Sequence, residues 1–292
     1  MLAAFGTALP ESVVTLAAVA FGTTAASKDL GVGAALGGPL ALSTIAYATV
    51  GIVLIASRQQ LAGTAGVAQA FRRLAADQSW FLAIFAVKIL LGVLVFAWKP
   101  WLGLLFLAAY AVYVRQEMTG PAEDDEGTLE RLKFQPRKTV PTTAMALLQT
   151  AIALIVIFVA SRLFVTQLET LGPAMGLSPQ LLALLLSPIA TELPETMNAI
   201  IWVRQGKYKL ALSNISGAMM IQATIPTALG LFFTPWHLSA PLLVAAGATM
   251  AAIAIMCIAF RRGIVSRWLL VAMGLFYAIF ASLIVILHLG GM

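Results

Sequence analysis

The chain has 292 residues, of which 61% are apolar and only 10% are charged. Because ordinary soluble domains carry about 25% charged residues, this composition excludes a water-soluble protein and indicates an integral membrane protein. The net charge of +6 therefore reports first on membrane topology, and we expect a lipid bilayer and no nucleic acid among the partners. Cys257 is the only cysteine, which excludes a disulfide within the chain.

Nine apolar segments follow one another along the chain, and we predict that each crosses the membrane as a helix. Helices are expected because hydrocarbon offers no partner to an unpaired backbone group, and a span needs about 20 residues. The segments are 3–22, 31–56, 80–98, 100–114, 142–165, 180–203, 210–233, 239–260 and 267–289. The predicted fold is an all-α membrane protein, a polytopic helical bundle of about nine spans.

The basic residues between these segments alternate in number from one side of the membrane to the other. Lys28 and Lys99 are the only basic residues in the loops of one side. The loops of the other side hold 14, and these loops are 57–79, 115–141, 204–209 and 261–267. Loops rich in Lys and Arg stay in the cytoplasm. We therefore predict a multi-pass protein of the cell inner (plasma) membrane, with its N-terminus in the cytoplasm and its C-terminus outside.

An acidic run lies in the longest predicted cytoplasmic loop. It consists of Glu123, Asp124, Asp125 and Glu126. The run lacks the spaced oxygen ligands of an EF-hand loop, and both a solvated linker and a regulatory cation site stay open. We divide the chain around it: residues 1–115 form a first half, 116–141 a cytoplasmic linker and 142–292 a second half.

A motif of the pattern small-Thr-x-Leu-Pro-Glu occurs once in each half, at residues 6–11 and 190–195. The copies belong to the first and sixth apolar segments, so they cross the membrane in opposite directions. Such inverted-topology repeats are typical of transporters. Pairing the two halves leaves segment 142–165 without a counterpart. We favour a missing N-terminal helix as the reason, and the alternative is a first half that is one helix short.

Each copy combines a proline inside a helix with a glutamate at membrane depth. Proline removes a backbone hydrogen bond and frees the carbonyl four residues before it, while a carboxylate in a span costs roughly 2.5–3.5 kcal/mol on insertion scales. Two copies related by a pseudo-twofold axis should meet near the membrane midplane. There Glu11 and Glu195 would form an oxygen cage for a hard cation such as Ca²⁺ or Na⁺. The alternative is that each proline is a simple kink and each glutamate caps a neighbouring helix.

The paired motif resembles the alpha-repeats of the cation/calcium exchanger superfamily, in particular those of prokaryotic sodium/calcium exchangers. Their pattern Gly-Thr-Ser-Leu-Pro-Glu is followed one span later by Gly-Asn-x-x-Gly-Ser-Asn. The resemblance implies that Glu11 and Glu195 bind the exchanged cations. Thr7 and Thr191 would assist as hydroxyl or carbonyl ligands, and Asn214 stands at the second Asn motif. The resemblance also implies no tightly bound cofactor, inorganic cations as partners, transported Ca²⁺ and Na⁺ (or H⁺), and no enzymatic activity.

The chain departs from that pattern at several positions. Glu192 stands where the motif has Ser and adds a carboxylate to the second copy. In the first half, Ala34, Gly38 and Leu42 replace polar residues, whereas Gln222 keeps a polar side chain in the second half. Glu192 and Gln222 therefore join the candidate cation ligands, and the coupling ion stays open.

Three further polar residues and two glycines have alternative roles. Lys88 lies near the middle of segment 80–98, where a buried ammonium is costly unless it is paired or neutral. It is a possible charge partner of a site carboxylate or an occupant of a cation position, and otherwise it snorkels or lies neutral in a helix contact. Asn214 and Gln222 serve alternatively as hydrogen-bonding residues between helices. Gly33 and Gly37 stand at the two glycine positions of the exchanger pattern, and their alternative role is to permit close packing of helices.

We predict a secondary active antiporter that exchanges Ca²⁺ for Na⁺ by alternating access at a midplane site formed by the two motifs. Proton coupling is an alternative because the site is poor in Na⁺ ligands. A degenerate homologue that binds without transporting is another, given the losses in the first half. An intramembrane hydrolase that uses Glu192 and Glu195 is the alternative from another class, but it leaves Glu11 unexplained.

Overall fold

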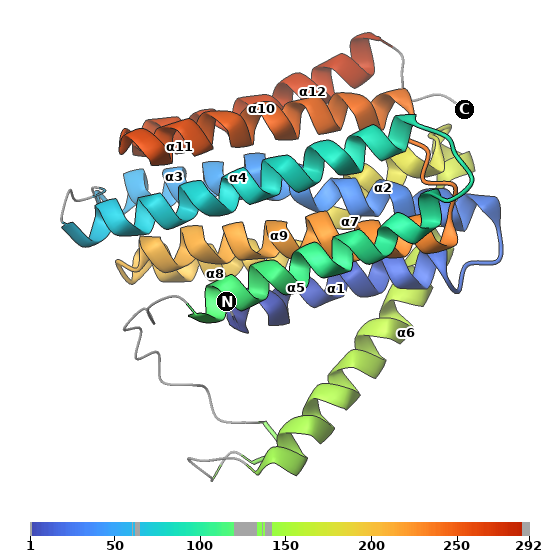
Figure 1. Cartoon of the computed structure of the whole chain (residues 1–292), viewed down its shortest axis with the longest axis horizontal. Helices are drawn as coiled ribbons and strands as arrows, with labels where there is room; N and C mark the ends of the chain where they lie inside the picture. The colour runs from blue at the N-terminus through green and yellow to red at the C-terminus, as the bar shows by residue number, and fades with distance from the viewer. Residues whose placement is uncertain are drawn as a thin grey trace.

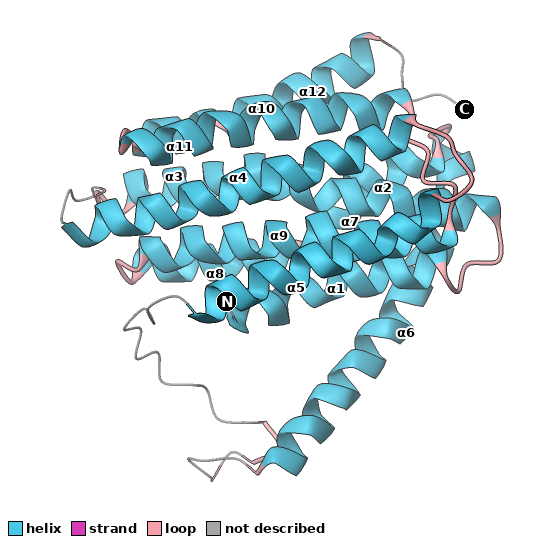
Figure 2. Ribbon diagram, in the orientation of Figure 1, coloured by secondary structure: helices cyan, strands magenta, loops and turns pink. Residues whose placement is uncertain are grey.

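A computed structural model describes residues 2–59, 61, 65–119, 133–135, 137 and 142–287, and for residues 2–8, 65, 66, 117, 118 and 173 it describes the backbone alone. Within these residues every regular element is a helix (Figure 2), so the predicted all-α fold is confirmed. The first half contains α1 (Leu2–Val19), α2 (Ala25–Ala41), η1 (Leu42–Ala46), α3 (Tyr47–Ala56), α4 (Ala65–Val93), η2 (Lys99–Leu102) and α5 (Gly103–Thr119). The second half contains α6 (Thr143–Met175), α7 (Pro179–Thr191), α8 (Leu193–Arg204), α9 (Tyr208–Phe233), α10 (Ala240–Arg262), α11 (Arg267–Ala272) and α12 (Gly274–Ile286). The acidic run at 123–126 lies outside the described residues.

The helices account for the nine predicted apolar segments. Within the described part of the chain, six helical stretches are long and apolar enough to cross a membrane: Ala25–Ala56, Val67–Val93, Thr143–Gly172, Tyr208–Phe233, Ala240–Arg262 and Arg267–Ile286. The other three segments fall on α1, on α5 and on the consecutive pair α7 and α8. The number of spans stays a prediction.

The helix α4 begins earlier than the sequence suggested, and the loop predicted at 57–79 is wrong from residue 65 onward. Val67, Phe71, Leu74 and Gln78 are buried, and their spacing places them on one face of a helix. Charged residues between them lower the mean hydropathy of the stretch, which hides this face from a reading based on apolar runs. An amphipathic extension therefore carries α4 to the edge of the bundle.

Helices of one half pack against helices of the other half, an arrangement that we call exchanged packing. In the first half, α1 packs on α9 and α2 packs on α7. The predicted repeat relates α1 to α7 and α8, and it relates α2 and α3 to α9, so these two contacts are equivalent. The helices run side by side along the bundle (Figure 1), and the exchanged packing brings both copies of the motif into its interior.

The helix α6 leans away from the bundle (Figure 1) and carries the predicted segment 142–165, extended to Met175. Its contact with the rest is at its C-terminal part, where Val165 and Leu168 join a small core with Val14 and Ala18. None of the residues in its most apolar 18-residue stretch is buried. Its apolar surface therefore faces outward, as expected of a helix in lipid.

The two copies of the motif differ in their backbone. The helix α1 continues across Pro10, whereas the second copy breaks at Glu192, the residue between α7 and α8. Pro188 precedes that break and Pro194 follows it, and neither has an N–H group for the helix. The second copy is therefore a discontinuous helix, the arrangement that transporters use at their binding sites.

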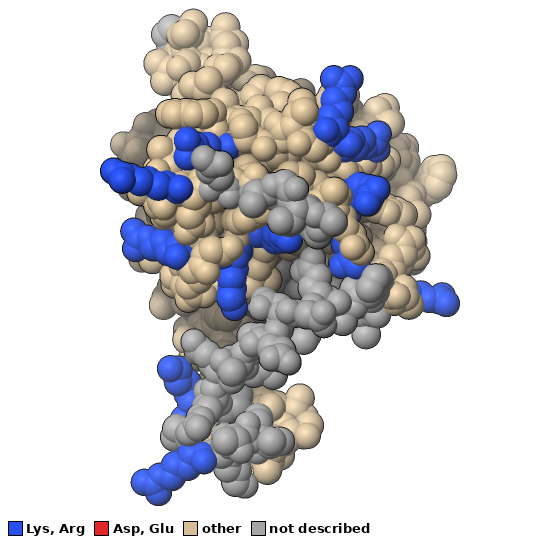
Figure 3. Space-filling model, turned by 90° about the vertical axis from the view of Figure 1, so that its left-hand side faces the viewer, with Lys and Arg blue, Asp and Glu red and all other residues tan. Residues whose placement is uncertain are grey.

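Basic side chains gather at one end of the bundle (Figure 3), where α8 turns into α9 and α10 turns into α11. The residues at these two turns are Arg204, Lys207, Lys209, Arg261, Arg262 and Arg267. No acidic side chain shows among the described residues on this face. This end corresponds to the side that the sequence predicts to be cytoplasmic, and its sidedness stays a prediction.

Candidate functional site

Charged side chains are buried inside the bundle where α1, α4, α8 and α9 come together. Glu11, Glu192, Glu195 and Lys88 are each at most 3% exposed, and Gln222 beside them is fully buried. Ionisable residues at membrane depth are expensive and mark ion pathways or substrate sites. These five residues form what we call the central cluster.

Glu11 reaches into the central cluster from α1. Its carboxylate interacts electrostatically with those of Glu192 and Glu195 and with the ammonium of Lys88. Neither of its oxygens accepts a hydrogen bond from an N–H or hydroxyl that the structure describes. Buried oxygens of this kind call for a water or an ion as partner, so a bound cation would satisfy Glu11.

Gly38 of α2 leaves the space that the Glu11 carboxylate fills. A Cβ atom at this position would lie 2.0 Å from Oε2 of Glu11 and 2.7 Å from Oε1 of Gln222. Both oxygens therefore converge on the same point of α2, and a residue without a side chain permits their approach. The exchanger pattern has Ser at this position, and here the Glu11 carboxylate fills the space that a serine side chain would occupy.

Glu192 is held in place at the break between α7 and α8. Nε2 of Gln222 donates to both carboxylate oxygens at 2.9 Å, and the hydroxyl of Thr191 donates to Oε1 at 3.0 Å. The Glu192 carboxylate therefore accepts hydrogen bonds from described donors, whereas the Glu11 carboxylate accepts none. The amide nitrogen of Gln222 thus binds Glu192, while its oxygen and Oε2 of Glu11 both approach Gly38.

Glu195 and Asn214 are also buried near the helix break. Glu195 lies in the first turn of α8, where the positive end of the helix dipole favours a carboxylate. Asn214 of α9 is 4% exposed, and neither its amide nitrogen nor its oxygen has a hydrogen-bond partner among the described residues. Asn214 therefore lacks the hydrogen bond between helices that its alternative role requires.

The ammonium of Lys88 lies within the bundle and does not snorkel to the surface. Nζ donates to the carbonyl oxygen of Ala35 at 2.7 Å and to that of Gln222 at 3.4 Å. It also interacts with Glu11. The side chain is fully buried, so its charge faces polar groups of three helices.

Most of the candidate site residues come together in this region. Glu11, Glu192, Glu195, Gln222, Thr191 and Lys88 lie in or beside the central cluster. The side chain of Thr7 lies outside the described residues. No group of three or more His, Cys, Asp or Glu side chains placed to hold one metal ion occurs in the described part of the chain. A cation in the central cluster would therefore also need amide or carbonyl oxygens.

A second buried polar network escaped the sequence analysis. Nε2 of Gln78 donates to the hydroxyls of Tyr47 and Ser216 at 3.0 and 2.9 Å, and the hydroxyl of Ser216 donates to Oδ2 of Asp77 at 3.3 Å. Asp77 and Gln78 belong to the part of α4 that was predicted as a loop. The amphipathic spacing of α4 was the signal that could have found them.

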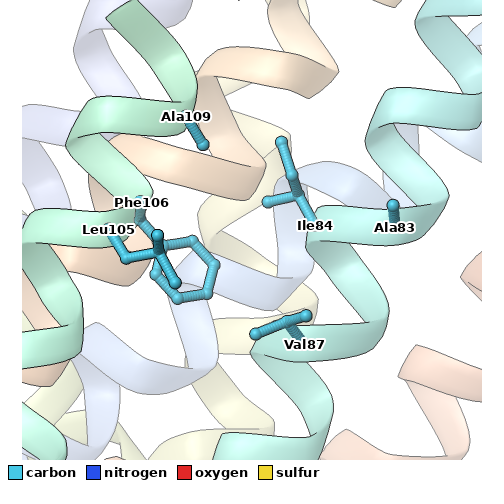
Figure 4. A pocket seen from close by; sticks show the side chains of 6 residues that line it. All are labelled: Ala83, Ile84, Val87, Leu105, Phe106 and Ala109. Carbon is cyan, nitrogen blue, oxygen red and sulfur yellow. The ribbon is translucent and has the colours of Figure 1, made fainter. Parts of the chain in front are cut away.

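A hollow between α4 and α5 is unsuited to cations. Its volume is about 220 Å³, and it is lined by Ala83, Ile84, Val87, Leu105, Phe106 and Ala109. Figure 4 shows these side chains around the hollow, all of them apolar. It offers no oxygen ligand, so the central cluster remains the candidate site.

Comparisons with known proteins identify the family of the chain. Residues 1–115 and 145–286 match the model of a family described as sodium/calcium exchanger protein. The chain is similar to the inner membrane protein YrbG of Escherichia coli (strain K12), with 30% identity over 234 residues, which cover 79% of this chain and 67% of that protein.

Solved structures of exchangers have a similar fold. The H⁺/Ca²⁺ exchanger CAX aligns with a TM-score of 0.63 and 18% identity, over 98% of this chain and 78% of that chain. The sodium-calcium exchanger NCX_Mj aligns with a TM-score of 0.61 and 17% identity, over 97% of this chain and 84% of that chain. At these identities the likeness concerns the fold.

Proposed function

The chain belongs to the sodium/calcium exchanger protein family, and on this premise we propose that it is a secondary active antiporter that exchanges Ca²⁺ for Na⁺. The observation that carries the proposal is the meeting of Glu11, from the first motif, with Glu192 and Glu195, from the second, inside the bundle. The family is one of membrane cation transporters and not of enzymes, so the hydrolase alternative lacks support.

The central cluster supplies the ligand chemistry that the proposal needs. Ca²⁺ prefers six to eight oxygen ligands, and its affinity rises with the number of carboxylates. Glu11 and Glu195 provide charge from the two halves, and Glu192 adds charge at the helix break. The free Oε1 of Gln222 lies near Oε2 of Glu11, so an amide oxygen and a carboxylate oxygen face the same space.

Alternating access has a structural basis in the exchanged packing. The contacts of α1 with α9 and of α2 with α7 join the two halves around the central cluster. Rocking one half against the other about a fixed site is the general motion of inverted-repeat transporters. Glu11 and Glu195 belong to different halves, so such a motion would change access to both at once.

Proton coupling is the second candidate, and a specific observation favours it. Ala34, Gly38 and Leu42 are buried on the helices that face the site, where the exchanger pattern has polar residues. Each loss removes an oxygen that would replace the water of a dehydrated Na⁺ ion. A proton needs no such cage, because a carboxylate carries it directly.

Uptake of radioactive Ca²⁺ into proteoliposomes tests the function. Purified protein is reconstituted, and uptake is driven by an outward Na⁺ gradient, by an outward proton gradient or by neither. We expect uptake above that of protein-free vesicles in the Na⁺ arm. Uptake in the proton arm alone would replace Na⁺ by H⁺ as the coupling ion.

The remaining outcome identifies a protein that binds but does not transport. In that case neither gradient drives uptake, while Ca²⁺ still stabilises the purified protein against heat, since a ligand that binds the folded state raises its stability. The absence of both uptake and stabilisation would remove Ca²⁺ as the cargo.

A further inference from the structure

Two prolines expose the carbonyl oxygens that hold Lys88. Pro39 lies inside α2 and Pro226 inside α9. A proline has no N–H group, so the carbonyl four residues before it receives no helical hydrogen bond. These carbonyls belong to Ala35 and Gln222, and they are the two acceptors of the Lys88 ammonium, at 2.7 and 3.4 Å.

Aromatic rings and a carboxylate complete the surroundings of this ammonium. Nζ lies 5.2 Å from the ring centroid of Phe85 and 5.8 Å from that of Trp236, distances at which a ring face attracts a cation. The indole N–H of Trp236 donates to the backbone carbonyl of Lys88 at 3.1 Å, which fixes the ring beside the helix. Glu11 supplies a negative charge nearby.

These groups are those of a site for a monovalent cation. Carbonyl oxygens released at interruptions of transmembrane helices coordinate Na⁺ in transporters, and one carboxylate balances one positive charge. Packing alone does not explain a lysine at this position, because an apolar side chain of similar volume fills a buried gap at lower cost. The position has two freed carbonyls and feels the charge of the Glu11 carboxylate, and the chain's own ammonium occupies it.

We propose that Lys88 is a tethered cation that permanently fills one monovalent-cation position of the exchanger. The ammonium takes the place of a freely exchanging ion beside Glu11, so the protein takes one monovalent cation fewer in each cycle than it would without the lysine. This inference rests on the proposed antiport. It predicts that removing the ammonium opens a site that a free monovalent cation then fills.

Direct binding of radioactive Na⁺ to purified protein tests the inference. Lys88→Met nearly keeps the volume of the side chain and removes the ammonium and its charge. We expect Lys88→Met to bind one more Na⁺ per chain than the wild type, and we expect Lys88→Arg, which keeps a cation, to match the wild type. Val87→Ala, the neighbouring change in the apolar hollow, controls for altered packing of α4 and should also bind like the wild type.

The double variant Glu11→Gln/Lys88→Met shows whether the gained ion depends on the carboxylate. We expect it to lose the additional Na⁺, because Glu11→Gln removes the charge that balances it. Lys88→Gln serves where Lys88→Met does not fold, since it keeps a polar end and lacks a charge. It should gain the same ion.

Two results would overturn the inference, and neither depends on transport. One is an unchanged number of bound Na⁺ in the folded Lys88→Met and Lys88→Gln proteins. The other is a gained Na⁺ that persists in the double variant. If the wild type instead shows no gradient-driven Ca²⁺ uptake, the proposed antiport fails, whereas Na⁺ binding still decides the role of Lys88.

Discussion

Gly38→Ser would place a side chain where the Glu11 carboxylate now lies. The added Cβ would be 2.0 Å from Oε2 of Glu11 and 2.6 Å from its Cδ. Non-bonded heavy atoms settle at about 3.5 Å, so the carboxylate has to retreat by roughly 1.5 Å. A misplacement of about 1 Å in a functional group can lower an enzyme's rate about 10²-fold, and we expect Ca²⁺ uptake to fall by a similar factor.

The same substitution should leave the protein folded. Overpacking costs about 1–3 kcal/mol, but replacing a glycine inside a helix returns part of it, since glycine is about 1 kcal/mol less favourable than alanine there and serine ranks between the two. The displaced atoms are at the end of a flexible side chain, which moves more easily than backbone. The loss should therefore show in transport and not in the yield of folded protein.

Gradient-driven Ca²⁺ uptake and thermal unfolding in detergent measure the two effects of Gly38→Ser. Gly247→Ser is the matched control, because a Cβ there meets no atom within 4 Å, and it should transport like the wild type. Wild-type or faster uptake by Gly38→Ser would refute the reasoning. It would mean that serine joins the ligands, as in the exchanger pattern, and that Glu11 does not need the space beside Gly38.

Three further predictions concern other parts of the chain. Glu192→Gln should reduce Ca²⁺ uptake less than loss of a motif glutamate, because the exchanger pattern has a neutral residue there; an equal loss would show that Glu192 replaces the oxygens missing from the first half. A cysteine at Gly206 should react with an impermeant thiol reagent only from the cytoplasmic side and one at His237 only from outside, and the reverse pattern would overturn the predicted orientation. Gln78→Ala should lower the free energy of unfolding by about 1–3 kcal/mol, because it removes the amide that donates to two buried hydroxyls, and an unchanged thermal midpoint would contradict that role.

The sequence predicted those features that depend on composition and on local pattern. Apolar runs located the helices, since a span in hydrocarbon has little choice of structure. The repeated motif selected Glu11 and Glu195, which the fold brings into one cluster. Lys88 stood out because a charge in the middle of an apolar segment needs a reason.

Other features depend on contacts between distant segments, and sequence reasoning missed them. Gly38 matters because the Glu11 carboxylate of α1 packs directly against it on α2, a contact between two different helices. The carbonyls of Ala35 and Gln222 become one site only because Lys88 of a third helix reaches both. Asp77 escaped because its helix is amphipathic and not uniformly apolar.

Exchange of radioactive Ca²⁺ for unlabelled Ca²⁺ tests most directly the claim that glutamates of both halves share one cation site. This exchange needs no coupling ion, so it gives the same answer for Na⁺ and proton coupling. Glutamine keeps the volume of glutamate and removes the charge on which divalent-ion binding depends. We predict that Glu11→Gln and Glu195→Gln each abolish or severely reduce the exchange while the protein still inserts and folds. Wild-type exchange in both variants would contradict the account and reduce the two motifs to helix kinks.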